Sequence, residues 1–332
     1  MINGQSQSER ERPDCMNSGT GRLICIGGAT VDWTYRTKDA VHLRTSNPAT
    51  SERSFGGVAR NVAENVARLG AHSSLVSMLG EDENGRAIRE SLDRLDIDTR
   101  HIGISADHAT AEYVAVLQPN GDLVLGLADM AIFDALTPTL LKEVWPDVSA
   151  SWIFADCNLP AQTVHELVDL ARRHSTMVAI DAVSVLKAMR LPRDLNGVGI
   201  LFLNLDEARA FLRRSSILPD EAAGTLLDCG AARVILTLGE GGLIAADRSG
   251  LTRLGAMAVQ VVDATGAGDA LIAGTLVALM NGSSLADAAR MGTAAAALTL
   301  ESAGSVRPDL SLSLLRSALE RSSNQPFERG IS

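Results

Sequence analysis

Short aliphatic runs alternate along this chain with longer segments whose apolar residues recur at helical spacing. The runs that predict strands are residues 23–28, 74–80, 151–157, 177–182, 199–204 and 233–239. The segments that predict helices are residues 58–69, 84–95, 161–174, 206–213 and 219–229. The first of these helices is expected to end at Gly70, a plausible C-cap. This alternation predicts an α/β fold with a largely parallel sheet covered by helices.

Two segments, residues 32–55 and 110–128, interrupt the alternation. They lack helical period, and the second contains Pro119, Asn120 and Gly121, which predict a hairpin turn. The chain has no internal repeat and no long linker rich in Pro, Gly or Ser. We therefore expect one α/β domain that carries a small β lid built from these two segments, rather than two tandem domains.

The ends of the chain indicate where the folded domain begins and ends, and its longest apolar stretches indicate whether it could span a membrane. Residues 1–20 are polar and mixed in charge, which predicts a disordered extension rather than a signal peptide or anchor. The folded domain is expected over residues 21–320, followed by a flexible tail over 321–332. The apolar stretches at 270–281 and 293–300 are too short and too alanine-rich to span a bilayer, so no membrane partner is expected.

Composition narrows the class of ligand. The 332 residues include 40 acidic and 30 basic side chains, and the net charge of −10 argues against binding to nucleic acid. Any anionic ligand must therefore be held locally. The 29 glycines, with only 3% aromatic residues, indicate many tight turns. Cys15, Cys25, Cys157 and Cys229 are scattered without a CxxC pair, which predicts reduced thiols in a cytoplasmic protein rather than a disulfide framework or zinc site.

The strongest chemical signal is the sequence DATGAGD at residues 263–269, followed by a helical pattern. A loop of small residues that opens a helix exposes unpaired backbone N–H groups at the positive end of the helix dipole, which makes an anion site. Gly266 and Gly268 allow close backbone approach, and Asp269 in the first helical turn can accept a proton. Taken alone, the motif could equally be a tight turn with a favourable first-turn acid.

Two further glycine motifs follow predicted strands. Residues 27–32 (GGATVD) follow the first strand, and residues 237–242 (TLGEGG) follow the strand at 233–239. Ligands of open α/β sheets bind at the carboxyl ends of the strands, so both motifs are placed to contact one. No GxxxxGK[ST] occurs, and GAGDAL does not complete GxGxxG, so the Walker A and dinucleotide-binding interpretations are rejected.

Three motifs in order resemble one enzyme family. DATGAGDALIAG is similar to the C-terminal signature of the ribokinase-like (PfkB) carbohydrate kinases, SFGGVARN at residues 54–61 resembles their N-terminal glycine signature, and NLDE at 204–207 resembles their NxxE element. The resemblance runs from about residue 22 to residue 318. It implies a ribokinase-like three-layer α/β/α fold with a mostly parallel central sheet and a small β lid. It also implies an ATP-dependent kinase that uses Mg²⁺, with K⁺ as the family's monovalent cation.

The resemblance assigns roles around the phosphates. It implies that Asp269 is the catalytic base that deprotonates a sugar hydroxyl. The amides of Gly266, Ala267 and Gly268 would form the anion hole for the transferred phosphoryl group, in keeping with the chemistry of phosphoryl transfer. Glu207 would organise Mg²⁺ through its waters, the alternative being a solvated acid in a first helical turn.

Further roles follow from the same resemblance. Asn204, Thr237, Gly239 and Gly242 would line the ATP site, and Asp32, Gly56, Gly57 and Asn61 would contact the acceptor sugar. Asp263, with the loop at residues 302–305, resembles the monovalent-cation site. An aspartate before a helix could equally be a cap, and Asn61 could be an ordinary first-turn polar residue.

Local details resemble the pseudouridine kinase branch of the family. They are Ser46-Asn47-Pro48, Arg60 within GVARN, residues 129–138, and DAVSVLKA at residues 181–188, where Ala182 replaces a proline but Ser184 and Lys187 are kept. The implied reaction phosphorylates the ribose 5′-hydroxyl of pseudouridine, with residues 45–47 of the lid able to reach the base. The alternatives are another sugar or nucleoside kinase of ribokinase-like specificity, and a non-catalytic sugar-binding regulator. Exposed edge strands of the lid also predict a homodimer formed through it.

Overall fold

The computed structural model describes residues 21–148 and 152–323. The predicted N-terminal extension and Cys15 lie outside the described residues, as do residues 324–332 of the predicted tail. The last helix, α10 (Leu312–Ser323), continues past the predicted domain limit at residue 320. The predicted tail therefore overlaps the last three residues of this helix, and the tail itself stays a prediction.

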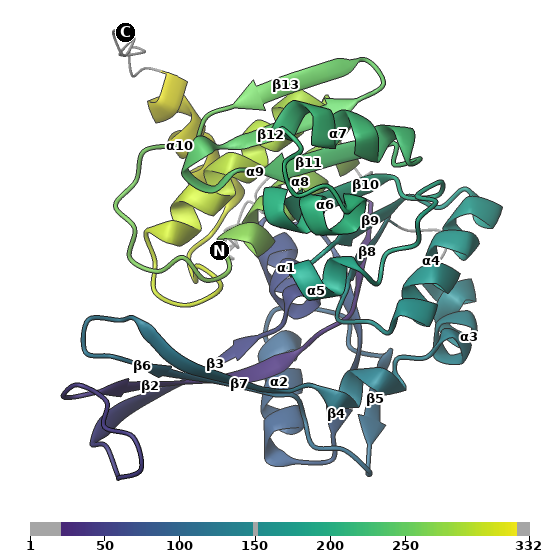
Figure 1. The fold of residues 1–332 in the computed structure, drawn as a ribbon. Coiled ribbons are helices and arrows are strands. Elements are labelled where there is room, and N and C mark those ends of the chain that lie inside the picture. Colours follow the sequence, from purple (N-terminus) through teal and green to yellow (C-terminus); the bar gives the residue numbers. More distant parts are fainter. Residues whose placement is uncertain (1–20, 149–151, 324–332) are drawn as a thin grey trace, which may run out of the picture.

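The centre of the molecule is a nine-stranded sheet in the order β13-β12-β11-β10-β9-β8-β1-β4-β5 (Figure 1). Its strands are β1 (Leu23–Ile26), β4 (Ser73–Gly80), β5 (Ile102–Ser105), β8 (Trp152–Asp156), β9 (Val178–Asp181), β10 (Ile200–Asn204), β11 (Arg233–Thr237), β12 (Leu243–Asp247) and β13 (Gly250–Leu254). Strands β11, β12 and β13 pair antiparallel at one edge, and the other pairings are parallel. The predicted mostly parallel sheet is confirmed.

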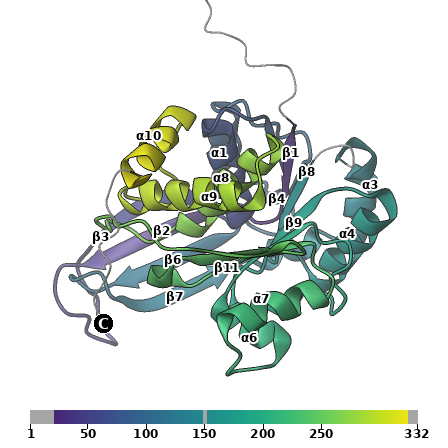
Figure 2. The same ribbon diagram turned by 90° about the horizontal axis from the view of Figure 1, so that it is seen from above.

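Helices cover both faces of this sheet, and each face has its own hydrophobic core (Figure 2). One layer contains α1 (Val58–Arg68), α2 (Glu83–Asp93), α8 (Ala267–Met280), α9 (Leu285–Leu300) and α10. The other contains α3 (Pro138–Val148), α4 (Ala161–His174), α5 (Val185–Ala188), α6 (Leu205–Leu212) and α7 (Pro219–Asp228). Strand β1 shows why both layers form: Leu23 and Cys25 enter one core, while Ile24 and Ile26 enter the other. The fold is the expected three-layer α/β/α arrangement.

The predicted elements lie within one or two residues of the observed ones, and the structure adds elements that the pattern missed. Five predicted helices correspond to α1, α2, α4, α6 and α7, and the helical pattern predicted after DATGAGD corresponds to α8. Not predicted were β5, β12, β13, α3, α5, α9, α10 and the short 3₁₀ turns η1 (Ala131–Ala135) and η2 (Gly239–Gly241). Helix α9 is rich in alanine and largely buried, so its sequence lacks the polar stripe by which an amphipathic helix is recognised.

A second, four-stranded sheet projects from the main body beneath α5 (Figure 1). Its order is β3-β2-β6-β7, with β2 (Thr30–Thr37), β3 (Ala49–Gly56), β6 (Glu112–Leu117) and β7 (Leu123–Asp129). The hairpin between β6 and β7 turns at residues 118–122, as predicted from Pro119-Asn120-Gly121. This lid is therefore made from the two predicted segments. Strands β2 and β6, which are far apart in sequence, pair in parallel.

The described residues bear on two features that the sequence was not expected to contain, a membrane span and a disulfide. Within the described ranges, no helix combines the length and apolar character that a membrane span requires. Cys25 and Cys157 are buried, Cys229 is half-buried, and all three are free thiols. The reduced state of the cysteines stays a prediction.

Candidate active site

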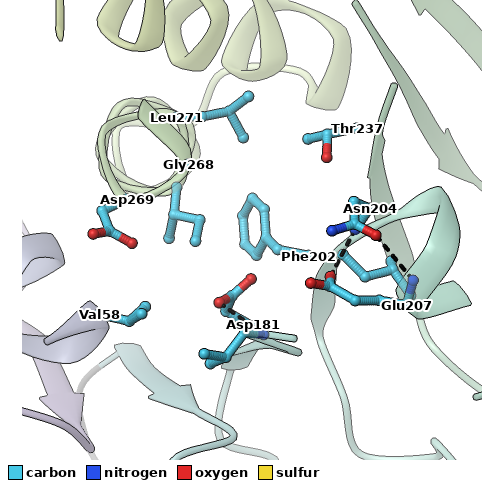
Figure 3. Close-up of a pocket in the computed structure, with 12 residues that line it drawn as sticks. Val58, Asp181, Phe202, Asn204, Glu207, Thr237, Gly268, Asp269 and Leu271 are labelled. Atoms are coloured by element: carbon cyan, nitrogen blue, oxygen red, sulfur yellow. Dashed lines mark hydrogen bonds between the residues drawn. The ribbon is translucent and has the colours of Figure 1, made fainter. Parts of the chain in front are cut away.

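The carboxyl ends of three parallel strands meet the start of α8 at a cavity of about 200 Å³ (Figure 3). Strand β9 ends at Asp181, β10 at Asn204 and β11 at Thr237, which all line the cavity. The full lining is Val58, Asp181, Val183, Phe202, Leu203, Asn204, Glu207, Thr237, Gly268, Asp269, Leu271 and Ile272. Figure 3 shows Asp269 on one side and the Asn204–Glu207 pair on the other, with Asp181 and Phe202 between them.

Asp269 occupies the first turn of α8 and contacts α1 directly. The Asn61 Nδ2 group donates a hydrogen bond of 2.8 Å to Asp269 Oδ2. Burial raises the pKa of Asp269 to about 7, and the nearby Asp156 and Asp32 charges act in the same direction, while Asn61 and Arg60 lower this pKa. A carboxyl group whose pKa lies near neutrality can gain or lose a proton at physiological pH. The arrangement therefore suits a proton acceptor.

The loop before α8 exposes backbone amides to the same space. Gly266 is the N-cap of α8 with φ of 76°, and a Cβ atom there would lie 1.8 Å from the Ser305 carbonyl oxygen. A side chain at Gly266 would thus collide with backbone, so glycine is required. Ala267 and Gly268 open the helix, where N–H groups have no intrahelical acceptor. Unpaired amides at the positive end of a helix dipole can bind an anion, and the anion hole formed by Gly266, Ala267 and Gly268 stays a prediction.

Asn204 and Glu207 form a capping box at the start of α6. The Glu207 amide donates to Asn204 Oδ1 at 2.9 Å, and the Asn204 amide donates to Glu207 Oε2 at 2.8 Å. The alternative in which Glu207 is a solvated acid does not hold, because Glu207 is 5% exposed. Burial raises the pKa of Glu207, while the Asn204 hydrogen bonds lower it.

Asp181 and Glu207 are the residues best placed to hold a divalent cation. Burial raises the pKa of Asp181, and the Glu207 and Asp269 charges raise it further. No lysine or arginine lines this cavity, so none of the lining side chains neutralises its acidic groups. In the described part of the chain, no three histidine, cysteine or acidic residues form a complete metal site. One or two carboxylates fit Mg²⁺, which retains waters and takes its remaining ligands from phosphates.

Asp263 forms hydrogen bonds that connect the loop before α8 with the loop at residues 302–305. Its Oδ1 accepts from the Thr265 amide at 2.8 Å, and its Oδ2 accepts from the Gly304 amide at 3.1 Å. The residue does bring the predicted loop 302–305 against the loop before α8. Both carboxylate oxygens have hydrogen-bond partners in the loops. Asp263 does not cap α8, because the N-cap is Gly266 and no side chain caps this helix. The role of Asp263 in binding K⁺ stays a prediction.

The glycines expected near the nucleotide do not line the cavity. Thr237 lines it, but Gly239 and Gly242 shape the turn between β11 and β12. Their φ angles are 59° and 84°, and a Cβ atom at Gly242 would lie 2.0 Å from the Leu254 carbonyl oxygen. These glycines therefore position the end of β11, and their contact with a nucleotide stays a prediction.

The residues predicted for the acceptor side lie together where the lid joins the main body. Thr30 Oγ1 donates to Asp32 Oδ1 at 2.8 Å, and a Cβ atom at Gly56 would lie 2.0 Å from Asp32 Oδ2. Gly57 is the N-cap of α1, with φ of 93° and its Cα packed against the Gly28 backbone. Burial raises the pKa of Asp32. Asn61, one turn later in α1, extends from this group to Asp269.

Asp156, at the end of β8, links three segments near the site, and the sequence analysis did not predict this role. Its Oδ2 accepts from the Gly28 and Ala59 amides at 2.9 Å each, and its Oδ1 accepts from the Asn158 amide at 2.8 Å. It therefore ties together the turn after β1, the start of α1 and the turn after β8. The sequence feature that could have revealed this role is the position of an acidic residue at the carboxyl end of a predicted strand.

The comparison with protein families decides which enzymes this site belongs to. A family model described as pfkB family carbohydrate kinase matches residues 20–311. This chain belongs to the pfkB family of carbohydrate kinases. It is therefore a kinase that acts on a sugar or nucleoside, and the reaction is transfer of a phosphoryl group to an alcohol.

Curated relatives of this pfkB kinase include two nucleoside kinases. The pseudouridine kinase of Escherichia coli (strain K12) is 27% identical over 305 residues, covering 90% of this chain and 96% of the relative. The guanosine-inosine kinase of Exiguobacterium acetylicum is 25% identical over 289 residues, covering 85% and 95%.

Solved structures share the fold of this pfkB kinase. A carbohydrate kinase from Agrobacterium tumefaciens is 30% identical with a TM-score of 0.81, covering 90% of this chain and 97% of that one. The Arabidopsis thaliana ribokinase, solved with ribose and ATP, is 20% identical with a TM-score of 0.78, covering 91% and 99%. The predicted ribokinase-like fold is confirmed.

Proposed function

We propose that this pfkB kinase transfers the γ-phosphoryl group of ATP to the ribose 5′-hydroxyl of pseudouridine, giving pseudouridine 5′-phosphate and ADP. One contact carries the proposal. Residues 129–138 and 181–188, which both resemble the pseudouridine kinase branch, meet where Lys187 Nζ lies 3.9 Å from Met130 Sδ and donates to Asn158 Oδ1. The similarity to a pseudouridine kinase over most of both chains supports the same acceptor.

The surroundings of Gly28 suit a nucleoside base. A Cβ atom at Gly28 would lie 3.0 Å from Asn158 Nδ2 and 3.5 Å from the Phe133 ring, so both side chains converge on this turn. Lys187 and Met130 complete the group. The ammonium of Lys187 and the amide of Asn158 can hydrogen-bond a uracil ring, which carries two carbonyls and two N–H groups. Phe133 is buried in the core and supports this group from behind.

The proposed chemistry places the reacting atoms between Asp269 and the start of α8. The oxygen of the 5′-hydroxyl bonds to the γ-phosphorus as the bond to the β,γ-bridging oxygen breaks, Asp269 takes the hydroxyl proton, and ADP leaves. The amides of Gly266, Ala267 and Gly268 stabilise the negative charge on the transferred group. Mg²⁺, held with its waters by Glu207 and Asp181, would neutralise charge on the phosphates when bound. Asn204, Thr237, Gly239 and Gly242 are proposed to position the nucleotide.

The acceptor is tested by measuring ADP release with Mg²⁺ and a panel of pseudouridine, uridine, adenosine and ribose. We expect kcat/KM for pseudouridine to exceed each of the others by at least about tenfold. A matched Lys187→Met variant should lose about tenfold in kcat/KM for pseudouridine and keep that for ribose, because Lys187 is proposed to face the base. Equal or better turnover of ribose would contradict the specificity. Binding of a sugar without phosphorylation would favour the regulator alternative.

We also propose that the lid forms a homodimer through the face that carries Trp33. Strand register places Trp33, Val114 and Leu127 in one row across the sheet, and Tyr35, Val116 and Leu125 in the next. Leu125 and Leu127 are 50% and 55% exposed. An apolar sheet face with an open edge strand, β7, favours association with a second copy of itself.

Light scattering tests this dimer. We expect a species of about 70 kDa, twice the 35.0 kDa mass of one chain. The double variant Leu125→Asp with Leu127→Asp should shift it to a monomer, because two charges would be buried at the interface. Leu123→Asp, on the other side of the register shift in β7, is the matched control and should remain dimeric. A wild-type protein that stays monomeric contradicts the proposal.

A further inference from the structure

Arg60 is a buried arginine one residue before Asn61, and its side chain is held on several sides. It is 5% exposed. Its Nη1 group donates to the Phe55 carbonyl at 3.1 Å and to Asn61 Oδ1 at 2.9 Å, while Nη2 donates to Glu64 Oε2. The guanidinium carbon lies 5.7 Å from the centre of the Phe55 ring. Burial of a charge is costly, so a cation retained here has to be compensated by these contacts.

The contact with Asn61 determines which way the Asn61 amide faces. A guanidinium can only donate, so the Asn61 oxygen must face Arg60. The Asn61 nitrogen then faces Asp269 and donates to its Oδ2 at 2.8 Å. Turned by half a revolution, the amide would place its oxygen against the Asp269 carboxylate, and both atoms would be acceptors. Arg60 therefore selects the orientation in which Asn61 supports an ionised Asp269.

The charge of Arg60 also acts on both acidic residues of the acceptor side. It lowers the pKa of Asp32 and the pKa of Asp269. Glu64 does not cancel this charge alone, because Arg68 Nη2 donates to Glu64 Oε1 at 2.6 Å. Glu64 is thus shared by two arginines, and Arg60 is the one whose charge acts on Asp32 and Asp269.

We propose that Arg60 is a positioning residue for phosphoryl transfer: it orients the Asn61 amide toward Asp269 and compensates the charges of Asp32 and Asp269. This inference rests on the proposed role of Asp269 as the base. With one Asp269 oxygen held by Asn61, the other is left for the substrate hydroxyl. The Phe55 carbonyl also accepts from Ser305 Oγ at 3.1 Å, so Arg60 is joined to the loop that packs against Gly266.

The test compares Arg60→Met with Arg68→Met, which removes the other arginine on Glu64 and does not touch Asn61. Arg60→Met leaves Glu64 paired with Arg68, so Glu64 itself is not left without a cation. We expect kcat to fall about 10- to 100-fold in Arg60→Met, with KM for ATP within about threefold of wild type. Arg68→Met should keep a kcat within about threefold of wild type.

The pH profile gives a readout that a purely structural role would not move. The charged groups facing Asp269 are Arg60 on α1, Asp32 on β2, Asp156 on β8 and, across the cavity, Asp181 on β9. Activity should rise as Asp269 ionises, near its pKa of about 7. Loss of the Arg60 charge raises that pKa, so the acid limb of kcat/KM should move up by roughly one pH unit in Arg60→Met. It should not move in Arg68→Met.

Two additional measurements keep the proposal open to refutation if Arg60→Met does not fold. Arg60→Lys keeps the charge, but one ammonium cannot bond Phe55, Asn61 and Glu64 in the geometry of a guanidinium, so kcat should fall at least about threefold. In wild-type protein labelled with ¹⁵N-asparagine, the side-chain amide signal of Asn61 should titrate between about pH 5 and 9 as Asp269 ionises.

The outcomes separate this inference from the proposed function. An unchanged kcat and acid limb in the folded Arg60 variants, or an Asn61 amide signal independent of pH, overturns the positioning role. If Asp269→Asn is inactive while the Arg60 variants behave as wild type, the base stands and the positioning role alone fails. If wild-type protein phosphorylates guanosine rather than pseudouridine, the acceptor fails while the Arg60 test can still be made with guanosine.

Discussion

Replacing Asp269 with asparagine is expected to lower kcat by about 10²- to 10⁴-fold. Asparagine has nearly the same size as aspartate but cannot accept the hydroxyl proton. Its side-chain oxygen can still accept the hydrogen bond from Asn61, so the local structure should persist. ATP affinity should change little, because the anion site is made of backbone amides. Steady-state kinetics and calorimetric titration with ATP check both expectations, and retained turnover would refute Asp269 as the base.

The same variant should be more stable than wild type at alkaline pH. The pKa of Asp269 is raised in the folded protein from the ordinary 3.8 to about 7, so above pH 7 the folded state contains a buried charge that the unfolded state exposes to water. The cost grows as the pH rises from about 4 to about 7 and is then constant. Its full value is about 4 kcal/mol, and partial exposure of the side chain reduces it to roughly 2 kcal/mol.

Urea unfolding at two pH values tests whether Asp269→Asn stabilises the folded protein at alkaline pH and not at acidic pH. At pH 8, Asp269→Asn should increase the free energy of unfolding by roughly 2 kcal/mol, and at pH 4 the gain should nearly disappear. Asp122→Asn, at the exposed hairpin between β6 and β7, serves as a control whose stability should change by less than about 0.5 kcal/mol. A gain of equal size at both pH values would contradict the buried charge as its cause.

Replacing Gly266 with alanine is the second change with a large expected effect. The added Cβ atom would lie 1.8 Å from the Ser305 carbonyl oxygen, and the φ of 76° is itself unfavourable for alanine. The loops at 263–266 and 302–305 must separate, which displaces the amides of the anion site. We expect kcat to fall about 100-fold and the free energy of unfolding to fall by about 2–4 kcal/mol.

Gly304→Ala separates the clash from the backbone strain. Gly304 has a similar φ of 84°, but a Cβ atom there would meet nothing within 4 Å. Its free energy of unfolding should fall by only about 1–2 kcal/mol, with kcat within about threefold of wild type. If both variants lose the same activity, left-handed strain rather than contact with Ser305 explains the effect.

The sequence predicts those helices and strands in which apolar residues occupy the buried positions and polar residues occupy the exposed ones. Helix α4, with its polar outer face, is predicted over its observed range of Ala161–His174. Helix α9 and strand β5 were not predicted, for two different reasons. The first is alanine-rich and buried on several sides, and the second is only four residues long. Helix α3 contains Pro146, which reads as a helix breaker.

The candidate site shows a similar division. The glycine loops and Asp269 are recognisable because their chemistry lies within a few consecutive residues. The role of Asp156 depends on hydrogen bonds to the distant Gly28 and Ala59, and that of Arg60 depends on the hydrogen bond between Asn61 and the distant Asp269. The burial of Glu207 likewise depends on how α6 packs, which its sequence does not specify. Residue type and spacing therefore indicate the chemistry, while the contacts that tune it require the three-dimensional arrangement.

A competition experiment tests the central claim most directly. Wild-type protein is incubated with limiting ATP, Mg²⁺ and equal concentrations of pseudouridine, uridine, guanosine, adenosine and ribose, and the phosphorylated products are identified by mass spectrometry and ³¹P NMR. The account predicts pseudouridine 5′-phosphate as the main product, with phosphorus coupled to the two C5′ protons. A main product of ribose phosphate or guanosine phosphate, or phosphorylation at another hydroxyl, would contradict it.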